Sequence, residues 1–84
     1  MFHVYVLKSS KIDKLYIGYT DNLKRRLLEH NSGFSKFTKP FIPWKLIYYE
    51  TYKELDDAKD RESKLKQYGQ AYRRLKERIS KSLQ

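Results

Sequence analysis

One glutamate, Glu62, occupies a position in the sequence where an apolar residue is expected. It follows Leu55 by seven residues and Ala58 by four, and it precedes Leu65 by three. In a helix, Glu62 therefore lies on the same face as these apolar residues. An unpaired carboxylate is costly to bury, so such a residue is either paired with a base at the rim of the core or bound to a metal ion. The spacing leaves both explanations open.

Arg26 and His30 form a second candidate pair. They are four residues apart and adjoin Leu23 and Leu27, so a helix projects both side chains from one side, near the edge of the core. A guanidinium stabilises charge on phosphate oxygens, and an imidazole accepts a proton near neutral pH. The two side chains could converge on one phosphate, although a solvated basic face has the same spacing.

Two tyrosines, Tyr5 and Tyr16, lie in segments rich in β-branched and aromatic residues. A turn near residues 10 and 11 would place them opposite or nearly opposite each other on one face of a hairpin. Simple packing of two large rings gives the same arrangement. Gly18 in the second segment indicates a bulge or the close approach of another group, such as the substrate backbone.

The first half of the chain has elements that can position these side chains. Residues 2–8 and 15–19 predict an antiparallel hairpin. Thr20 and Asp21 offer N-capping oxygens to a helix over 22–32, which Gly33 would end. Residues 34–43 contain two prolines, so we expect a loop without regular structure there.

The second half predicts a third strand over 44–52, paired with the hairpin, and then two helices. The first of these has its apolar stripe at Leu55, Ala58 and Leu65 and is expected to end at Gly69; the second is marked by Tyr72, Leu75, Ile79 and Leu83. The resulting order is β-β-α-β-α-α. We therefore predict an α+β fold in which three helices flank a small three-stranded antiparallel sheet, as a single domain over residues 1–84.

Composition narrows the classes of partner and of metal site. Nineteen Lys and Arg against ten Asp and Glu give a formal net charge of +9, which favours a polyanion; nucleic acid is the leading candidate and an anionic membrane surface the rival. There is no apolar run long enough to span a bilayer and no signal-peptide pattern, so we expect a cytoplasmic protein. Because the chain has no cysteine, any metal must be held by oxygen or imidazole.

Together these positions resemble a known family. Over nearly the whole chain, they resemble the motifs of the GIY-YIG nuclease superfamily. The matching segments are His3-Val4-Tyr5, Tyr16-Ile17-Gly18, Leu23-Lys24-Arg25-Arg26 with His30, and Arg61-Glu62 with Leu65-Lys66. The likeness is closest to small stand-alone bacterial members, which are similar to the N-terminal nuclease domain of excinuclease C. Two positions depart from the pattern: His3 replaces a glycine, and the C-terminal half lacks the asparagine that several branches carry.

The resemblance implies an endonuclease that hydrolyses DNA phosphodiester bonds, selects DNA structure and acts in DNA repair or recombination. It implies one Mg²⁺ or Mn²⁺ ion held by Glu62, waters and the scissile phosphate. Tyr5 would be the general base and His30 would assist it, while Tyr16 orients water or phosphate and Arg26 neutralises developing charge.

Several residues are candidates for binding nucleic acid away from the chemistry. Lys36 and Lys39 lie in a loop interleaved with aromatic residues, and Arg73 and Arg74 lie on the basic face of the last helix; Gly18 would admit the substrate backbone. The loop could instead close over the core, with Trp44 as its anchor. The face of the last helix could equally be only solvated.

Two other functions remain open from the sequence. The chain could be a non-catalytic nucleic-acid-binding module on the same fold, or an accessory subunit whose protein partner supplies substrate selectivity. We expect DNA as the partner, with RNA not excluded, and no membrane association.

Overall fold

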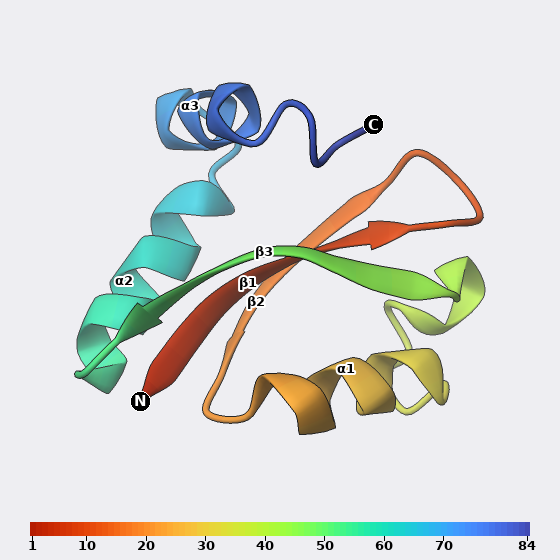
Figure 1. Cartoon of the computed structure of the whole chain (residues 1–84). Coiled ribbons are helices and arrows are strands. Elements are labelled where there is room, and N and C mark those ends of the chain that lie inside the picture. Colours follow the sequence, from red (N-terminus) through yellow and green to blue (C-terminus); the bar gives the residue numbers. More distant parts are fainter.

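Three strands pair into one antiparallel sheet in the order β2-β1-β3, in a computed structural model that describes residues 1–84 (Figure 1). The strands are β1 (Phe2–Ser9), β2 (Leu15–Thr20) and β3 (Trp44–Tyr52). The helices are α1 (Leu23–Asn31), α2 (Leu55–Leu65) and α3 (Gln70–Arg78), with a short 3₁₀ turn, η1, at Lys39–Phe41. The predicted α+β class and the order β-β-α-β-α-α are confirmed.

The central strand β1 is buried on both faces, which explains why it reads as a nearly continuous apolar run. Val4 and Val6 face a core shared with α2 and α3, and Tyr5 and Leu7 face a smaller core shared with α1. Figure 1 shows α1 on one side of the sheet, with α2 and α3 on the other. The sheet therefore separates two layers of helices, and the Tyr5 face lies under α1.

A bulge in β3 changes which residues of this strand face each layer. Leu46 pairs with Leu7 but Tyr48 pairs with Val6, so Ile47 is the extra residue. Because an extra residue reverses the alternation of side chains, Trp44 and Leu46 pack in the Tyr5 layer while Tyr48 packs in the Val4 layer. No feature of the sequence marks this switch.

The C-terminal half of β3 anchors helix α2 through a half-buried ion pair. Arg61 donates from Nε and Nη2 to the two carboxylate oxygens of Glu50, at 2.9 and 3.0 Å. Tyr48 and Tyr52 donate to the same carboxylate at 2.6 and 2.5 Å, and these bonds help to hold the pKa of Glu50 below its usual value against its burial. The bidentate contact fixes both the position and the rotation of α2, and with it Glu62, the residue after Arg61.

The predicted cap of the first helix and the predicted loop are corrected by the structure. Asn22, rather than Thr20 or Asp21, caps α1, since its side chain accepts from the backbone N–H of Arg25 at 3.0 Å. The segment predicted to be irregular contains η1, because the fixed φ of Pro40 suits the first residues of a helical turn. Gly33 follows α1 with φ +83°, as the sequence predicted.

The last two helices are shorter than their apolar stripes. Helix α2 ends at Leu65 instead of running to Gly69, because Tyr68 takes a left-handed conformation with φ +56°. Helix α3 ends at Arg78, and Leu83 packs against the core from the turns that follow. Apolar spacing thus continues past the point where the backbone leaves the helix. None of the helices has the length and apolar character that a membrane span needs.

Candidate active site

The tyrosine pair lies on the sheet face that α1 covers. The register pairs Tyr5 with Gly18 and Leu7 with Tyr16, so the two tyrosines are diagonal neighbours, and their ring centroids are 6.3 Å apart. The predicted shared face is confirmed. Gly18 provides the space for this arrangement, since a Cβ built there would lie 2.5 Å from the Tyr5 hydroxyl and 2.7 Å from Cζ. The close approach that the sequence indicated is therefore made by the Tyr5 phenol.

We expect Gly18→Ala to displace the Tyr5 phenol and to lower any activity that depends on it by at least tenfold. The Tyr5 ring is buried and cannot yield freely, so the added methyl group should also cost about 1–3 kcal/mol of stability, as overpacking does. Gly69→Ala is the control, because a Cβ there meets nothing within 4 Å. Turnover and urea unfolding would be measured on both variants, and unchanged turnover in Gly18→Ala would contradict the prediction.

His30 is fully buried beneath Tyr5 and is held at both ring nitrogens. Nε2 lies 3.0 Å from the Tyr5 hydroxyl and Nδ1 lies 2.9 Å from Thr38 Oγ1. The Thr38 hydroxyl faces the carbonyl of Ser35 at 3.4 Å, which can only accept. We therefore assign the proton of His30 to Nδ1, so that Nδ1–H donates to Thr38 and the Tyr5 hydroxyl donates to Nε2.

Thr38 is positioned by the two ends of the loop that carries it. Trp44 donates from its indole Nε1 to the carbonyl of Thr38 at 2.8 Å. Asn31 closes the loop, because its side-chain amide donates to the Trp44 carbonyl at 2.9 Å and accepts from the Trp44 N–H at 2.6 Å. Trp44 thus anchors the core, and the loop holds the tautomer of His30.

Burial shifts the pKa values of both members of the hydrogen-bonded pair toward their neutral forms. Burial, together with the charge of Arg26, lowers the pKa of His30 to about 4, against a smaller opposing effect of Glu29. Burial also raises the pKa of Tyr5 to about 12, with further increases from Tyr16 and Glu62, although Arg26 beside the phenol lowers it. At neutral pH the resting pair is therefore a neutral phenol and a neutral imidazole.

The lowered pKa of His30 predicts a stability change with pH. The unfolded chain takes up a proton at this residue near pH 6.5, whereas the folded chain does so only near pH 4. The stabilisation is therefore complete above about pH 6.5 and is lost as the pH falls toward 4. Urea unfolding between these values should show a decline that is smaller in His30→Gln, where only other groups such as Glu50 still lose stability toward acid pH. Parallel pH curves for the two proteins would contradict it.

Arg26 lies on α1 beside the same pair of side chains. Its Nη1 is 3.0 Å from Glu29 Oε1, and its charge acts on both Tyr5 and His30. A guanidinium here leaves further N–H donors for an anion, because a monodentate ion pair uses only one of the five.

Glu62 reaches the cluster from α2, which packs against β1 and β2. Its side chain is only 15% exposed, and Oε2 lies 3.2 Å from Lys66 Nζ. Lys66 also lies over the ring of Tyr16, at 5.6 Å from its centroid. The Glu62 carboxylate is therefore paired with a base at the rim of the core, which is one of the two explanations that the sequence left open. It also lies near enough to Tyr5 to raise the pKa of the phenol.

The Glu62 carboxylate fits a hard divalent cation whose other ligands would be water and substrate phosphate rather than protein side chains. No three His, Cys, Asp or Glu side chains come together in a way that could hold a metal ion. Mg²⁺ is commonly bound through one or two carboxylates, with waters and substrate phosphates completing its octahedron. Glu62 is a single carboxylate of this kind, since the flexible Lys66 can move away from it.

Of the candidate nucleic-acid-binding residues, Gly18 lies at the cluster and the four basic residues do not gather there. Lys36 is exposed in the loop after α1, and Lys39 is exposed at the start of η1. Arg73 and Arg74 are exposed on α3, on the opposite side of the sheet from α1 (Figure 1).

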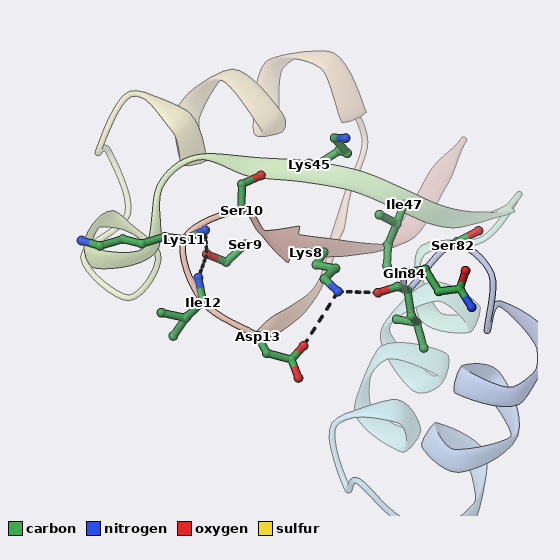
Figure 2. A pocket seen from close by; sticks show the side chains of 11 residues that line it. Lys8, Ser9, Ser10, Lys11, Ile12, Asp13, Lys45, Ile47, Ser82 and Gln84 are labelled. Atoms are coloured by element: carbon green, nitrogen blue, oxygen red, sulfur yellow. Dashed lines mark hydrogen bonds and ion pairs between the residues drawn. The ribbon is translucent and has the colours of Figure 1, made fainter.

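The largest cavity of the molecule, about 620 Å³, lies away from the cluster of Tyr5, His30 and Glu62 (Figure 2). It lies between the β1–β2 turn, β3 and the C-terminal residues, and its lining includes none of Tyr5, Tyr16, Arg26, His30 or Glu62. Lys8 crosses it to reach Asp13 at 3.8 Å and the carbonyl of Leu83. Lys8 and Asp13 are thus already paired with each other within the chain.

Two further residues complete the cluster, Thr38 and Lys66, and neither was assigned a role from the sequence. Thr38 carries no signal, because a single hydroxyl in an irregular loop has no periodicity to mark it. Lys66 did carry one, since it follows Glu62 by four residues on the same helix, the spacing at which ion pairs form.

Comparison with known proteins shows the family to which the chain belongs. The model of the GIY-YIG catalytic domain matches residues 1–80. A UPF0213 protein of Clostridium perfringens is 40% identical over 67 residues, covering 79% of this chain and 71% of the relative. One of Syntrophus aciditrophicus is 42% identical over 72 residues (82% and 80%), and one of Halobacterium salinarum is 38% identical over 72 (84% and 92%). No solved structure matches. The chain therefore belongs to the GIY-YIG nuclease family.

Proposed function

We propose that this chain is a divalent-metal-dependent endonuclease that hydrolyses DNA phosphodiester bonds, with Tyr5, Tyr16, Arg26, His30 and Glu62 as its catalytic set. The observation that carries the proposal is the buried hydrogen bond from Tyr5 to His30. Burying a polar imidazole costs free energy that an apolar side chain of the same size would not, so a core histidine with both nitrogens hydrogen-bonded indicates a role beyond packing. This hydrogen bond places a proton acceptor 3.0 Å from a phenol at the edge of the site.

In the proposed mechanism, Tyr5 is the general base. The phenol takes a proton from the attacking water as its own proton passes to Nε2 of His30, 3.0 Å away. Thr38 stabilises the imidazolium that forms, because it accepts from Nδ1–H. Tyr16 orients the water or the phosphate, and Arg26 offers its free N–H donors to the phosphate oxygens as their charge develops.

Glu62 would hold the metal ion, Mg²⁺ or Mn²⁺, together with waters and the scissile phosphate. When bound, the ion would neutralise the phosphate and lower the pKa of nearby acids. The pKa of Tyr5, about 12 in the chain alone, makes this contribution necessary, since a neutral phenol in a buried site is a weak base at pH 7. The proposal therefore predicts no cleavage by the protein in a chelator.

The test is cleavage of labelled duplex, flap, junction and single-stranded DNAs by the whole chain with Mg²⁺, Mn²⁺ or chelator. Metal-dependent cleavage of any of them supports the proposal. If none is cut while all are bound with a steep salt dependence, the chain is a binding module or a partner-dependent subunit, and the catalytic roles fail. Structure-selective action in DNA repair or recombination predicts that a flap or junction is cut faster than intact duplex.

A further inference from the structure

A second cavity, of about 490 Å³, adjoins the catalytic cluster at Tyr16. Its aromatic lining consists of Tyr16, Phe37, Trp44 and Tyr68, two lysines border it, and no acidic residue is among its lining. This volume lies within the range of sites that bind small organic molecules. The combination of aromatic rings with two lysines and no acidic lining residue indicates a flat occupant that carries negative charge nearby.

Two of the aromatic rings are unusually exposed. Phe37 is 86% exposed and Tyr68 is 59% exposed, although both rings are large enough to dominate the energetics of a core or an interface. Phe37 comes from the loop before η1, and Tyr68 comes from the turn between α2 and α3. Neighbouring exposed rings on two separate segments point to a contact with another molecule.

The backbone at Tyr68 is held in a conformation that favours glycine. Its φ is +56°, its N–H donates to the carbonyl of Leu65 at 3.1 Å, and its ring contacts that of Tyr72 edge-on at 5.0 Å. Unfavourable conformations of this kind persist where the surrounding structure enforces them, and they cluster at binding sites. The turn thus presents the Tyr68 ring to the cavity at a cost to the local backbone.

Lys66 joins this cavity to the proposed metal-binding carboxylate. Its Nζ lies 3.2 Å from Glu62 Oε2 and 5.6 Å from the centroid of Tyr16, and it also lines the cavity together with Lys14. A molecule in the cavity would therefore lie next to a phosphate bound at the cluster. The two lysines could contact the phosphates on either side of it.

We propose that this cavity receives an unpaired nucleobase of the strand being cut, which stacks on Tyr68 and Phe37. A paired base is covered on its faces by its neighbours in the duplex, whereas an unpaired base offers its face to aromatic side chains. The proposal rests on the proposed nuclease function and narrows its substrate to nucleic acid with an unpaired nucleotide beside the scissile phosphate, as in a flap or a bulge.

The binding test uses flap DNA with 2-aminopurine at the unpaired position and a chain carrying Glu62→Gln, in chelator, so that the DNA stays intact. Stacking on an aromatic ring quenches this fluorophore, so we expect quenching on binding that is lost when Tyr68→Ala or Phe37→Ala is added. Tyr68→Phe should retain it. Phe34→Ala is the matched control, because Phe34 is 75% exposed on the same loop but does not line the cavity.

The kinetic test compares kcat/KM on the flap with that on a nicked, fully paired duplex of the same sequence. We expect a preference for the flap of about five- to a hundredfold, the value of stacking one base, which falls toward one in Tyr68→Ala and stays in Phe34→Ala. Unchanged fluorescence on binding would overturn the proposal, and the exposed rings of Phe37 and Tyr68 would then be explained by contact with a protein partner. If nothing is cut but quenching depends on Tyr68, the base subsite stands and the nuclease function fails.

Discussion

Replacing Glu62 with glutamine is expected to lower metal-dependent cleavage about a thousandfold while leaving DNA binding intact. The amide keeps the shape of the side chain but removes the charge that would hold the cation, and such a cation is worth several kcal/mol in the transition state. Each 1.36 kcal/mol is about tenfold in rate. Single-turnover cleavage in Mg²⁺ measures the loss, and fluorescence anisotropy in chelator measures binding.

Asp60→Asn is the matched control for this variant. Asp60 lies on the same helix and pairs with Lys64 at 3.0 Å, but its side chain is exposed. Both variants lose one ion pair with a lysine. For the exposed pair of Asp60 this costs about 0–1 kcal/mol, and the amide in Glu62→Gln keeps the shape of the half-buried side chain, so both variants should fold. Equal cleavage by Glu62→Gln and Asp60→Asn would remove Glu62 from the proposed metal site.

Replacing Tyr5 with phenylalanine is expected to lower the cleavage rate by about 10²–10⁴-fold, the usual contribution of a general base. The variant should also lose about 1–3 kcal/mol of stability, because Nε2 of the buried His30 is left without a donor. The phenyl ring still fills the space above Gly18, so the core remains packed. Turnover at a temperature well below the unfolding transition separates the two effects.

Tyr19→Phe serves as the control, since Tyr19 lies on the same hairpin but its side chain is on the opposite face of β2. A second comparison uses His30→Gln, which removes the imidazole that receives the proton from Tyr5. If the two residues act as one unit, the double variant should be little slower than Tyr5→Phe alone. A rate for Tyr5→Phe within twofold of the wild type would exclude the proposed base.

The strands, and the order of strands and helices along the chain, could be predicted from local signals in the sequence. The β-branched and aromatic runs gave all three strands to within a residue of their observed ends, and the third strand, Trp44–Tyr52, was predicted without error. The first helix was also predicted to within a residue at each end, but α2 ends before Gly69 and α3 ends before Leu83, because apolar spacing reports which side chains reach the core. It does not report where the backbone leaves the helix, as at Tyr68.

What the sequence determined by itself is the set of chemical groups and the elements that carry them: Tyr5 and Tyr16 on one hairpin face, Arg26 with His30 on one helix, and Glu62 on an apolar face of another. Only the tertiary structure decided how these groups meet. The bidentate bond between Arg61 and Glu50 fixes the helix that carries Glu62, and a loop hydroxyl, Thr38, fixes the tautomer of His30. Periodicity records the burial of a side chain within its own element, whereas a hydrogen bond between residues far apart in the chain leaves no local pattern.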